Sequence, residues 1–284
     1  MTTNSLATSA ETVATCISRE IHDGDVVGLG LGTFIPAAGA MLAQLTHAPS
    51  VDFFLSPAGA YVRELPILTL TLSEWATQDR IIDRPHLSEA FGQEVHPAHV
   101  EFFRPAQIDP YGRFNTSFIG SFKSPSLRLP GAAGIPDVTA ILKRLYYYLP
   151  RHDRRTLVRE VDFVTGGPTC IGAVEEGARQ AGSRAFRMVT ELGVFGFNEE
   201  GYVEVLSLHE GITRAEVLEK TGFPLSGSWK ERTPPPSKEE ITLLRETIDP
   251  LGVMALETLP SRERRQRLTE IFSHERRVLE ERLR

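Results

Sequence analysis

The hydrophobic and polar positions of the chain alternate between two spacings, one typical of helices and one typical of strands. Residues 9–21 carry apolar side chains at intervals of three and four, which predicts a helix with Ser9 as its N-cap. Residues 25–32 have the pattern of a buried strand that runs into a glycine turn, and a helix is expected over 36–45. A strand is expected at 51–55. This alternation predicts an α/β protein with an open mixed or parallel sheet flanked by helices.

Later in the chain the apolar runs are shorter, and turn residues separate them. Strands are expected at 66–72, 100–103, 114–119, 141–149, 186–190 and 202–206, and helices at 87–95, after Thr213, from Ser237 to about 248, and over 261–284. Thr213 and Glu216 have the spacing of a capping box, and the prolines at 234–236 predict a linker. The last helix interleaves arginine with glutamate around one apolar face, which favours packing on a partner over contact with nucleic acid.

Composition excludes several classes of protein. The 284 residues, 41% of them hydrophobic, are enough for a large core and are not typical of a disordered chain. The net charge of −6 argues against a general nucleic-acid binder. No apolar run approaches the roughly 20 residues of a membrane helix, and residues 1–10 have neither a basic start nor an apolar signal segment. We therefore expect a soluble cytoplasmic protein with no nucleic-acid or membrane partner.

The two cysteines and three closely spaced glycines suggest sites that the sequence does not support. Cys16 and Cys170 form no close-spaced metal motif, so both are expected to be buried, unreactive thiols, and no metal is expected. The glycines at 28–32 lack the spacing of a dinucleotide fingerprint, because position 33 is threonine. A tight turn between strand and helix is the favoured interpretation, and an anion at the N-terminus of the following helix remains an alternative.

One histidine lies in a charged segment. His152 is surrounded by Arg151, Asp153, Arg154 and Arg155. It is either a catalytic histidine or part of a solvated, charge-paired turn, and the second interpretation is favoured.

Two loops between residues 97 and 168 have the character of a ligand-binding floor. The first, 106–116, reads Ala-Gln-Ile-Asp-Pro-Tyr-Gly-Arg-Phe-Asn-Thr and contains a strong turn signal at 109–112. The second, 129–137, reads Leu-Pro-Gly-Ala-Ala-Gly-Ile-Pro-Asp. Glycine and alanine let a ligand approach the backbone closely and leave N–H groups free to bind it.

These loops belong to a longer series of motifs that resembles the β subunit of glutaconate CoA-transferase and its relatives in the class I CoA-transferase family. The resemblance covers roughly residues 10–250 in order. The matching pieces are 106–112, 115–116, 129–137, 151–154, 161–165, 189–197, 206–211 with Thr213, 233–237 and 248–250. We therefore expect a CoA-transferase β-type domain at 9–250, preceded by a loose tail at 1–8 and followed by a helical extension at 251–284 that goes beyond the family. The resemblance also implies an open α/β fold with an α-type companion subunit, in a hetero-oligomer with the active site between the two chains.

The resemblance further implies an acyl-CoA substrate, in which coenzyme A is part of the substrate and no cofactor is permanently bound. By position, Gln107 is expected to be catalytic, and the backbone of Gly131, Ala132, Ala133 and Gly134 is expected to hold the thioester oxygen. Fixed N–H donors stabilise the negative charge that this oxygen develops under attack. Asn115 either holds substrate or satisfies its own turn, and the second alternative is slightly favoured.

The sequence departs from the family at the nucleophile. Family members carry a glutamate after the second strand, in a segment ending Glu-Ser-Gly-Ala, and it forms a glutamyl-CoA thioester. Here 54–60 reads Phe-Leu-Ser-Pro-Ala-Gly-Ala, so Pro57 or Ser56 occupies that place, and Glu64 lies too far along the chain to replace it. Ser56 either positions a water or a substrate carboxylate, or is an ordinary turn residue.

This departure leaves three hypotheses for the function. The first is an enzyme that hydrolyses, cleaves or decarboxylates an acyl-CoA without a glutamyl-CoA. The second is a transferase whose nucleophile comes from elsewhere. The third is a non-catalytic partner of an α subunit, which the glycine-rich loop and Gln107 argue against.

Overall fold

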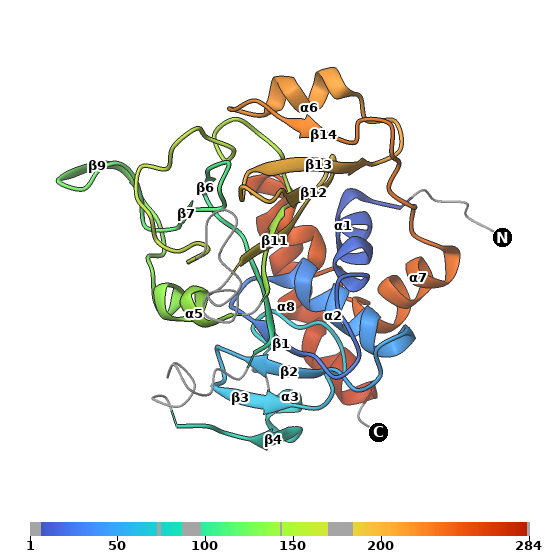
Figure 1. Cartoon of the computed structure of the whole chain (residues 1–284). Helices are drawn as coiled ribbons and strands as arrows, with labels where there is room; N and C mark the ends of the chain where they lie inside the picture. The colour runs from blue at the N-terminus through green and yellow to red at the C-terminus, as the bar shows by residue number, and fades with distance from the viewer. Residues whose placement is uncertain (1–6, 73–74, 87–97, 143, 170–183, 283–284) are drawn as a thin grey trace. The chain divides into compact units, whose positions relative to one another are not determined.

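A computed structural model of the protein describes residues 7–72, 75–86, 98–142, 144–169 and 184–282. The chain divides into two compact units, one made of 1–85 and 235–284 and the other of 86–234 (Figure 1). The expected linker at 234–236 lies at this division. The segment 251–284 is part of the first unit. Residues 1–6 of the expected tail, and the whole helix expected at 87–95, lie outside the described residues.

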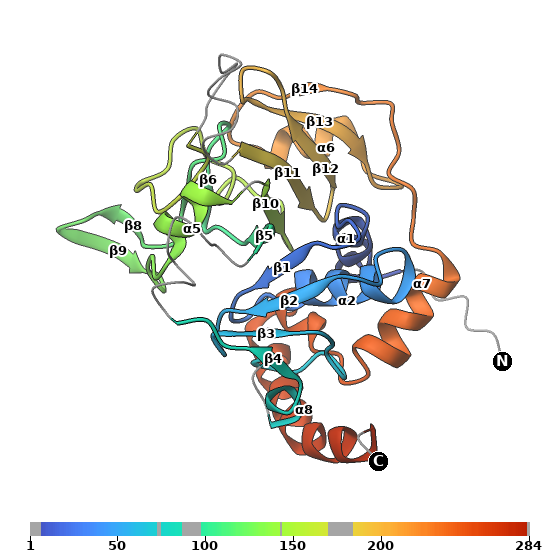
Figure 2. The ribbon, with the colours of Figure 1, turned by 60° about the horizontal axis from the view of Figure 1, so that its bottom comes forward.

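The first unit contains a mixed four-stranded arrangement. Strand β1 (Val26–Leu29) pairs in parallel with β2 (Asp52–Leu55), and β3 (Ala60–Val62) and β4 (Ile81–Asp83) follow in antiparallel pairing (Figure 2). Most residues of β1 and β2 are buried, as their continuous apolar pattern predicts. The strands expected at 25–32 and 51–55 are therefore confirmed.

Helices α1 (Ser9–Ser18) and α2 (Phe34–Thr46) pack against each other at a point where only glycine fits. A Cβ at Gly39 of α2 would lie 2.7 Å from the carbonyl oxygen of Ala14 and 2.7 Å from Ile17 Cγ2. The cap of α1 is Thr8 and not Ser9: Thr8 accepts from the Glu11 amide, and Glu11 accepts from the Thr8 amide. Glu11, three residues after Thr8, completes the capping box, and this spacing makes Thr8 the N-cap.

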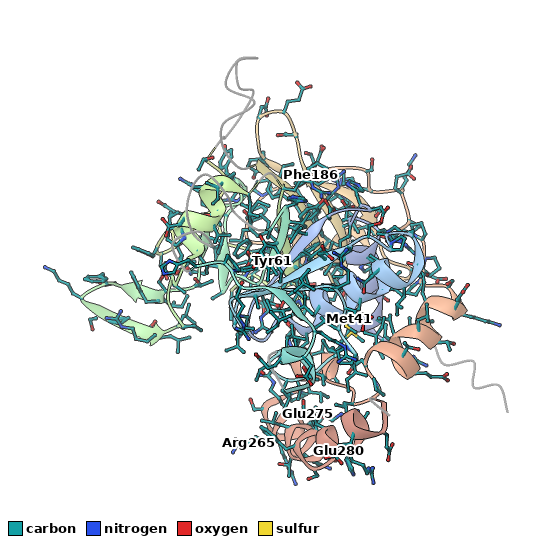
Figure 3. The ribbon with its side chains drawn as sticks, turned by 90° about the horizontal axis from the view of Figure 1, so that it is seen from below. Met41, Tyr61, Phe186, Arg265, Glu275 and Glu280 are labelled. Atoms are coloured by element: carbon teal, nitrogen blue, oxygen red, sulfur yellow. The ribbon has the colours of Figure 1, made fainter. Side chains whose placement is uncertain are left out.

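The C-terminal segment completes the first unit. Ser237 caps α7 (Lys238–Thr242) with a capping box, and the π-helical turn η1 (Leu243–Ile248), the 3-10 turn η2 (Met254–Glu257) and α8 (Ser261–Arg282) follow. Short α3 (Trp75–Gln78) precedes β4. Figure 3 shows charged side chains of α8, among them Arg265, Glu275 and Glu280, arrayed around the helix. None of the described helices is long and apolar enough to cross a membrane.

The strand expected at 66–72 does not form. Its amides bond elsewhere within the first unit: the Leu68 amide donates to the Ile248 carbonyl (2.7 Å) and the Leu70 amide donates to Glu275 Oε1 (3.2 Å). Leu72 has a φ of 59°, which no strand residue adopts. Contacts with the distant C-terminal segment have therefore overridden the local alternation of the sequence.

The second unit is built on a mixed sheet in the order β5-β10-β11-β12-β13-β14. Its strands are β5 (Val100–Phe103), β10 (Arg144–Leu149), β11 (Arg184–Thr190), β12 (Gly193–Phe197), β13 (Val203–Leu208) and β14 (Ser226–Gly227). Strand β10 is parallel to β5 and to β11, whereas β12 is antiparallel to both of its neighbours. The expected strands near 100–103, 186–190 and 202–206 are confirmed, and Tyr146, Tyr147 and Tyr148 of β10 are fully buried.

Two small hairpins and two helices surround this sheet. Strands β6 (Gln107–Ile108) and β7 (Phe114–Asn115) form one hairpin, and β8 (Phe118–Ser121) and β9 (Ser124–Arg128) form a second that projects from the unit (Figure 1). The helices are α5 (Ile135–Ile141) and α6 (Arg214–Lys220), the latter capped by Thr213 as expected. The strand expected at 114–119 is therefore two strands, and the one expected at 141–149 begins only at Arg144.

Candidate active site

Gln107 and Asn115 face each other across the β6–β7 hairpin, which the turn at 109–112 closes. They are directly opposed in the antiparallel register, and Asn115 Nδ2 donates to Gln107 Oε1 at 2.8 Å. The turn holds its shape because buried Asp109 accepts from the amides of Tyr111 (2.9 Å) and Arg113 (3.0 Å) and from the Arg113 guanidinium. The sequence motif thus forms one rigid element that presents two amide side chains together.

The side-chain amides of Asn115 and Gln107 differ in how many of their N–H donors remain free to bind a ligand. Asn115 also donates to the Phe118 carbonyl (2.6 Å) and accepts from the Ser117 amide (2.9 Å), so both of its N–H donors are used, one by Gln107 and one by Phe118. Gln107 Nε2 donates to Asp162 Oδ2 (3.2 Å), and its oxygen accepts from the Asp162 amide (3.0 Å). Gln107 therefore keeps one amide hydrogen that no described residue accepts. Asp162 orients it, a contact between distant segments that the sequence analysis missed.

The glycine-rich loop at 131–134 joins this hairpin directly. The Gly131 amide donates to the Thr116 carbonyl at 2.9 Å, and Thr116 Oγ1 donates to the Gly131 carbonyl at 2.9 Å. The amide of Gly131 is thus committed to the protein and is not available to a ligand, contrary to expectation. The amides of Ala132, Ala133 and Gly134 make no hydrogen bond to any described residue.

The conformation of this loop is strained and open. Ala133 has a φ of 45°, a left-handed conformation that is rare outside glycine and is typical of functional sites. Ala133 is exposed, and Gly131, Ala132 and Gly134 are partly exposed, so the loop is not packed shut against its own sheet. Its three uncommitted amides can donate to an anionic oxygen.

Ser56 belongs to the first unit, at the carboxyl end of β2. Its amide extends the β1–β2 pairing by donating to the Leu29 carbonyl (3.1 Å), and the turn 56–59 leads into β3. The Ser56 hydroxyl makes no hydrogen bond to any described residue, so none of these residues is positioned as its general base. It is partly exposed and free to bind a ligand.

The glycine turn after β1 does not offer a free helix terminus. The Ile35 amide, at the start of α2, donates to the buried carboxylate of Glu257 at 2.9 Å. A carboxylate at this position complements the helix dipole. The chain's own anion thus occupies the site where a nucleotide or other anion was an alternative.

His152 is neither solvated nor positioned as a base. It is 1% exposed, and its ring lies between Thr190 Oγ1 (3.0 Å) and Thr221 Oγ1 (2.9 Å). Thr221 donates its hydrogen to the Val217 carbonyl, so His152 Nε2 must donate to Thr221 and Nδ1 must accept from Thr190. Burial lowers the pKa of His152 to about 3, so it is neutral and structural. The favoured prediction of a charged turn was therefore wrong for His152.

Glu101 is a functional candidate that the sequence analysis missed. It lies on β5 opposite Leu145 of β10, and strand alternation places it on the same sheet face as Phe103. Phe103 packs on Phe114 of the β6–β7 hairpin, with ring centroids 5.3 Å apart, so Glu101 lies on the sheet face against which Phe114 packs. Glu101 is half-buried and makes no hydrogen bond or ion pair with any described residue, and its burial raises its pKa to about 7. An unpaired carboxyl of this kind is typical of functional sites.

Cysteine and metal chemistry contribute nothing further among the described residues. Cys16 is buried in α1, and burial raises the pKa of its thiol to about 11, as expected for an unreactive cysteine. Cys170 lies outside the described residues. In the described part of the chain, no group of three or more His, Cys, Asp or Glu residues is arranged to hold a metal ion.

Comparison with known proteins gives consistent matches along most of the chain. The family model described as Coenzyme A transferase matches residues 10–220. The β subunit of the 3-oxoadipate CoA-transferase of Pseudomonas knackmussii is 30% identical over 250 residues, which cover 83% of this chain and 91% of that protein. The cholesterol ring-cleaving hydrolase IpdB subunit of Mycobacterium tuberculosis is 29% identical over 256 residues, 86% of this chain and 96% of that protein.

Two solved structures have the same fold. The decarboxylase AibA/AibB aligns with a TM-score of 0.72 and 27% identity, covering 87% of this chain and 97% of that chain. Glutaconate coenzyme A-transferase from Acidaminococcus fermentans aligns with a TM-score of 0.77 and 24% identity, covering 89% of this chain and 98% of that chain. The expected α/β architecture is thereby confirmed.

Proposed function

The chain belongs to the coenzyme A transferase family, and on this premise we propose that it is the β-type subunit of a two-subunit enzyme that acts on an acyl-CoA thioester without a glutamyl-CoA intermediate. The reaction is hydrolysis, carbon–carbon cleavage or decarboxylation of the CoA ester. Relatives named as a ring-cleaving hydrolase and a decarboxylase support this range of chemistry. Coenzyme A enters as part of the substrate, and the partner is an α-type subunit.

The observation that carries this proposal is the open loop at 131–134 beside Gln107. Three uncommitted amides, at Ala132, Ala133 and Gly134, adjoin a hairpin that holds Gln107 with one free amide hydrogen. Preorganised donors of this kind stabilise the negative charge that a thioester oxygen gains when the carbonyl carbon is attacked. A non-catalytic partner of an α-type chain has no use for such donors.

The absence of a carboxylate after β2 carries the second half of the proposal. Ser56 and Pro57 occupy the strand end, and neither side chain can form an acyl or CoA thioester of the glutamyl type. Without a covalent intermediate, a water attacks the carbonyl carbon in hydrolysis or in hydrolytic carbon–carbon cleavage, whereas decarboxylation releases CO₂ and leaves the electron pair of the broken bond as the thioester enolate. The Ser56 hydroxyl makes no hydrogen bond to any described residue and is therefore free to bind a water or a substrate carboxylate.

Product analysis of the purified two-subunit complex tests the proposal. Incubation with an acyl-CoA, with and without an acceptor acid, is expected to give free CoA, CO₂ or a CoA ester with a cleaved carbon–carbon bond, irrespective of the acceptor. Formation of a new acyl-CoA only when the acceptor is present would overturn the proposal and establish the second candidate, a transferase with its nucleophile elsewhere. The relative named as a 3-oxoadipate CoA-transferase favours that candidate.

Gln107→Met tests the oxyanion role, because methionine keeps the side-chain length and removes the donor. We expect kcat to fall about 10²- to 10³-fold with little change in KM. Phe272→Ser, at an exposed position on α8, serves as the control and should leave both constants unchanged. An unchanged kcat for the Gln107 variant would remove this residue from the mechanism.

A further inference from the structure

The β8–β9 hairpin projects from the second unit as a two-stranded ribbon of its own (Figure 2). Residues 120–128 are all exposed except Pro125, which is half-buried. The register pairs Ser121 with Ser124, so Phe122 and Lys123 form the turn at the tip. A ribbon of two strands is only marginally stable in water unless a hydrophobic face of it is covered. The ribbon 118–128 is therefore typical of an element that a partner stabilises.

The ribbon carries an aromatic cluster with a cation beside it. Phe118, at the base, is buried and packs on Phe122, with ring centroids 5.7 Å apart, and on Phe163, with ring centroids 5.0 Å apart. The Arg128 guanidinium lies 5.9 Å from the ring centroids of both Phe118 and Phe122, within the range of a cation–π contact. Phe122 is nevertheless 70% exposed, and Phe163 is exposed too. Exposed apolar clusters mark interaction sites, and phenylalanine and arginine are enriched at protein interfaces.

The charge of the ribbon is opposite to that of the whole chain. Residues 118–128 include Lys123 and Arg128 and no acidic residue, whereas the chain has a net charge of −6. Neither cation forms an ion pair with any described residue. Unpaired cations on a projecting element complement an acidic surface and speed its approach.

The base of the ribbon is bonded to the candidate active site. The Gly120 amide donates to Asp162 Oδ2 at 2.7 Å, and the same oxygen accepts from Gln107 Nε2 at 3.2 Å. Phe163, the residue after Asp162, belongs to the aromatic cluster. A partner seated on the ribbon therefore lies beside the residue that orients Gln107.

We propose that the ribbon 118–128 is the surface on which the α-type subunit docks, with Phe122 as an apolar anchor in a partner pocket that is edged by carboxylates. The inference rests on the proposed function and names the surface through which its partner binds. A second copy of this chain is disfavoured as the occupant, because it would bring the same residues again and no further group to the site. A small ligand is also disfavoured, since ligand sites are concave and the tip of a projecting ribbon is not.

The affinity of the purified chain for its α-type subunit, measured by biolayer interferometry, tests this surface. Phe122→Ser should raise the Kd about 10- to 100-fold, because an interface anchor is truncated. Lys123→Glu should raise the Kd through a slower association rate, and this loss should shrink at high salt. Phe272→Ser, at a phenylalanine of α8 that is 66% exposed, is the matched control and should leave the Kd unchanged.

Thermal unfolding of the isolated variants checks that they are folded. The unfolding midpoints are expected to equal that of the wild type, because Phe122 and Lys123 are both exposed. A loss of affinity with an unchanged midpoint then belongs to the contact and not to the fold.

Each other outcome contradicts the inference. An unchanged Kd for either ribbon variant would exclude its residue from the subunit contact. Loss of self-association of the isolated chain, with binding of the α-type subunit intact, would assign the ribbon to a second copy. Weaker binding of an acyl-CoA to the assembled variant, with subunit affinity intact, would assign it to the substrate. A wild-type chain that does not bind the α-type subunit would overturn the proposed two-subunit enzyme as well, whereas the other results leave that enzyme standing.

Discussion

The ionised form of Glu101 is expected to lower the free energy of unfolding, and this effect depends on pH. Its pKa is raised by burial from 4.5 to about 7, so between these values the folded state binds the proton more tightly than the unfolded state. The contribution of protonated Glu101 to the free energy of unfolding is fully present below pH 4.5 and is lost as the pH rises through 7. The shift corresponds to a loss of at most about 3 kcal/mol at pH 8, because the side chain is partly exposed and solvent screens its charge. A protein that retains such a residue is expected to use it.

Glu101→Gln separates the two roles. We expect the variant to be more stable than the wild type at pH 8, by up to about 3 kcal/mol, and equal to it near pH 4. Urea unfolding at both pH values measures this, with the exposed Glu160→Gln as control. If turnover falls while stability rises, Glu101 acts in the reaction. A variant that is no more stable at pH 8 would show that the carboxyl is not buried uncharged.

At the scale of single residues, the sequence could identify the site's motifs but not their hydrogen bonds. Gln107 and the loop at 131–134 are recognisable from residue type and spacing. The commitment of the Gly131 amide to Thr116, and the contact of Gln107 with Asp162, join segments far apart in the chain. No local pattern encodes them. His152 was misjudged for the same reason, because Thr190 and Thr221, which bury it, follow 38 and 69 residues later.

At the scale of elements, strands and helices with strong local signals were predicted well. The two strands expected at 25–32 and 51–55 formed, as did the helices capped by Thr213 and Ser237. These predictions succeeded because hydrophobic periodicity and helix capping act within a few residues. The segment 66–72 alternates like a strand, yet its amides bond to Ile248 and Glu275. Tertiary contacts decide such cases, and single-sequence patterns do not contain them.

The crossing of α1 and α2 gives a prediction at the same scale. Helix propensity alone says that Gly39→Ala stabilises α2 by about 1 kcal/mol. The added Cβ would lie 2.7 Å from the Ala14 carbonyl oxygen and from Ile17 Cγ2, so the two helices must move apart. We expect a net loss of about 1–3 kcal/mol, since overpacking outweighs propensity. Thermal and urea unfolding measure it, and a gain in stability would contradict this helix contact.

At the scale of the whole molecule, the chain supplies half of the proposed enzyme. The loop amides and Gln107 belong to the second unit and Ser56 to the first, and no described residue is positioned as a general base for the Ser56 hydroxyl. We therefore expect the isolated chain to show no turnover and the mixture with its α-type subunit to elute as one hetero-oligomer with activity. Size-exclusion chromatography with light scattering and a thioester assay on the same fractions measure both. Full activity of the chain alone would contradict the need for a partner.

The central claim is that an acyl-CoA is processed here with no CoA thioester formed on this chain. Mass spectrometry of the complex, trapped with borohydride during turnover of an acyl-CoA, tests it directly. The account predicts that this chain keeps its unmodified mass and that activity survives the treatment while free CoA, CO₂ or a carbon–carbon-cleaved CoA ester accumulates. A reduced carboxyl on this chain, with loss of activity that requires the acyl-CoA, would contradict it.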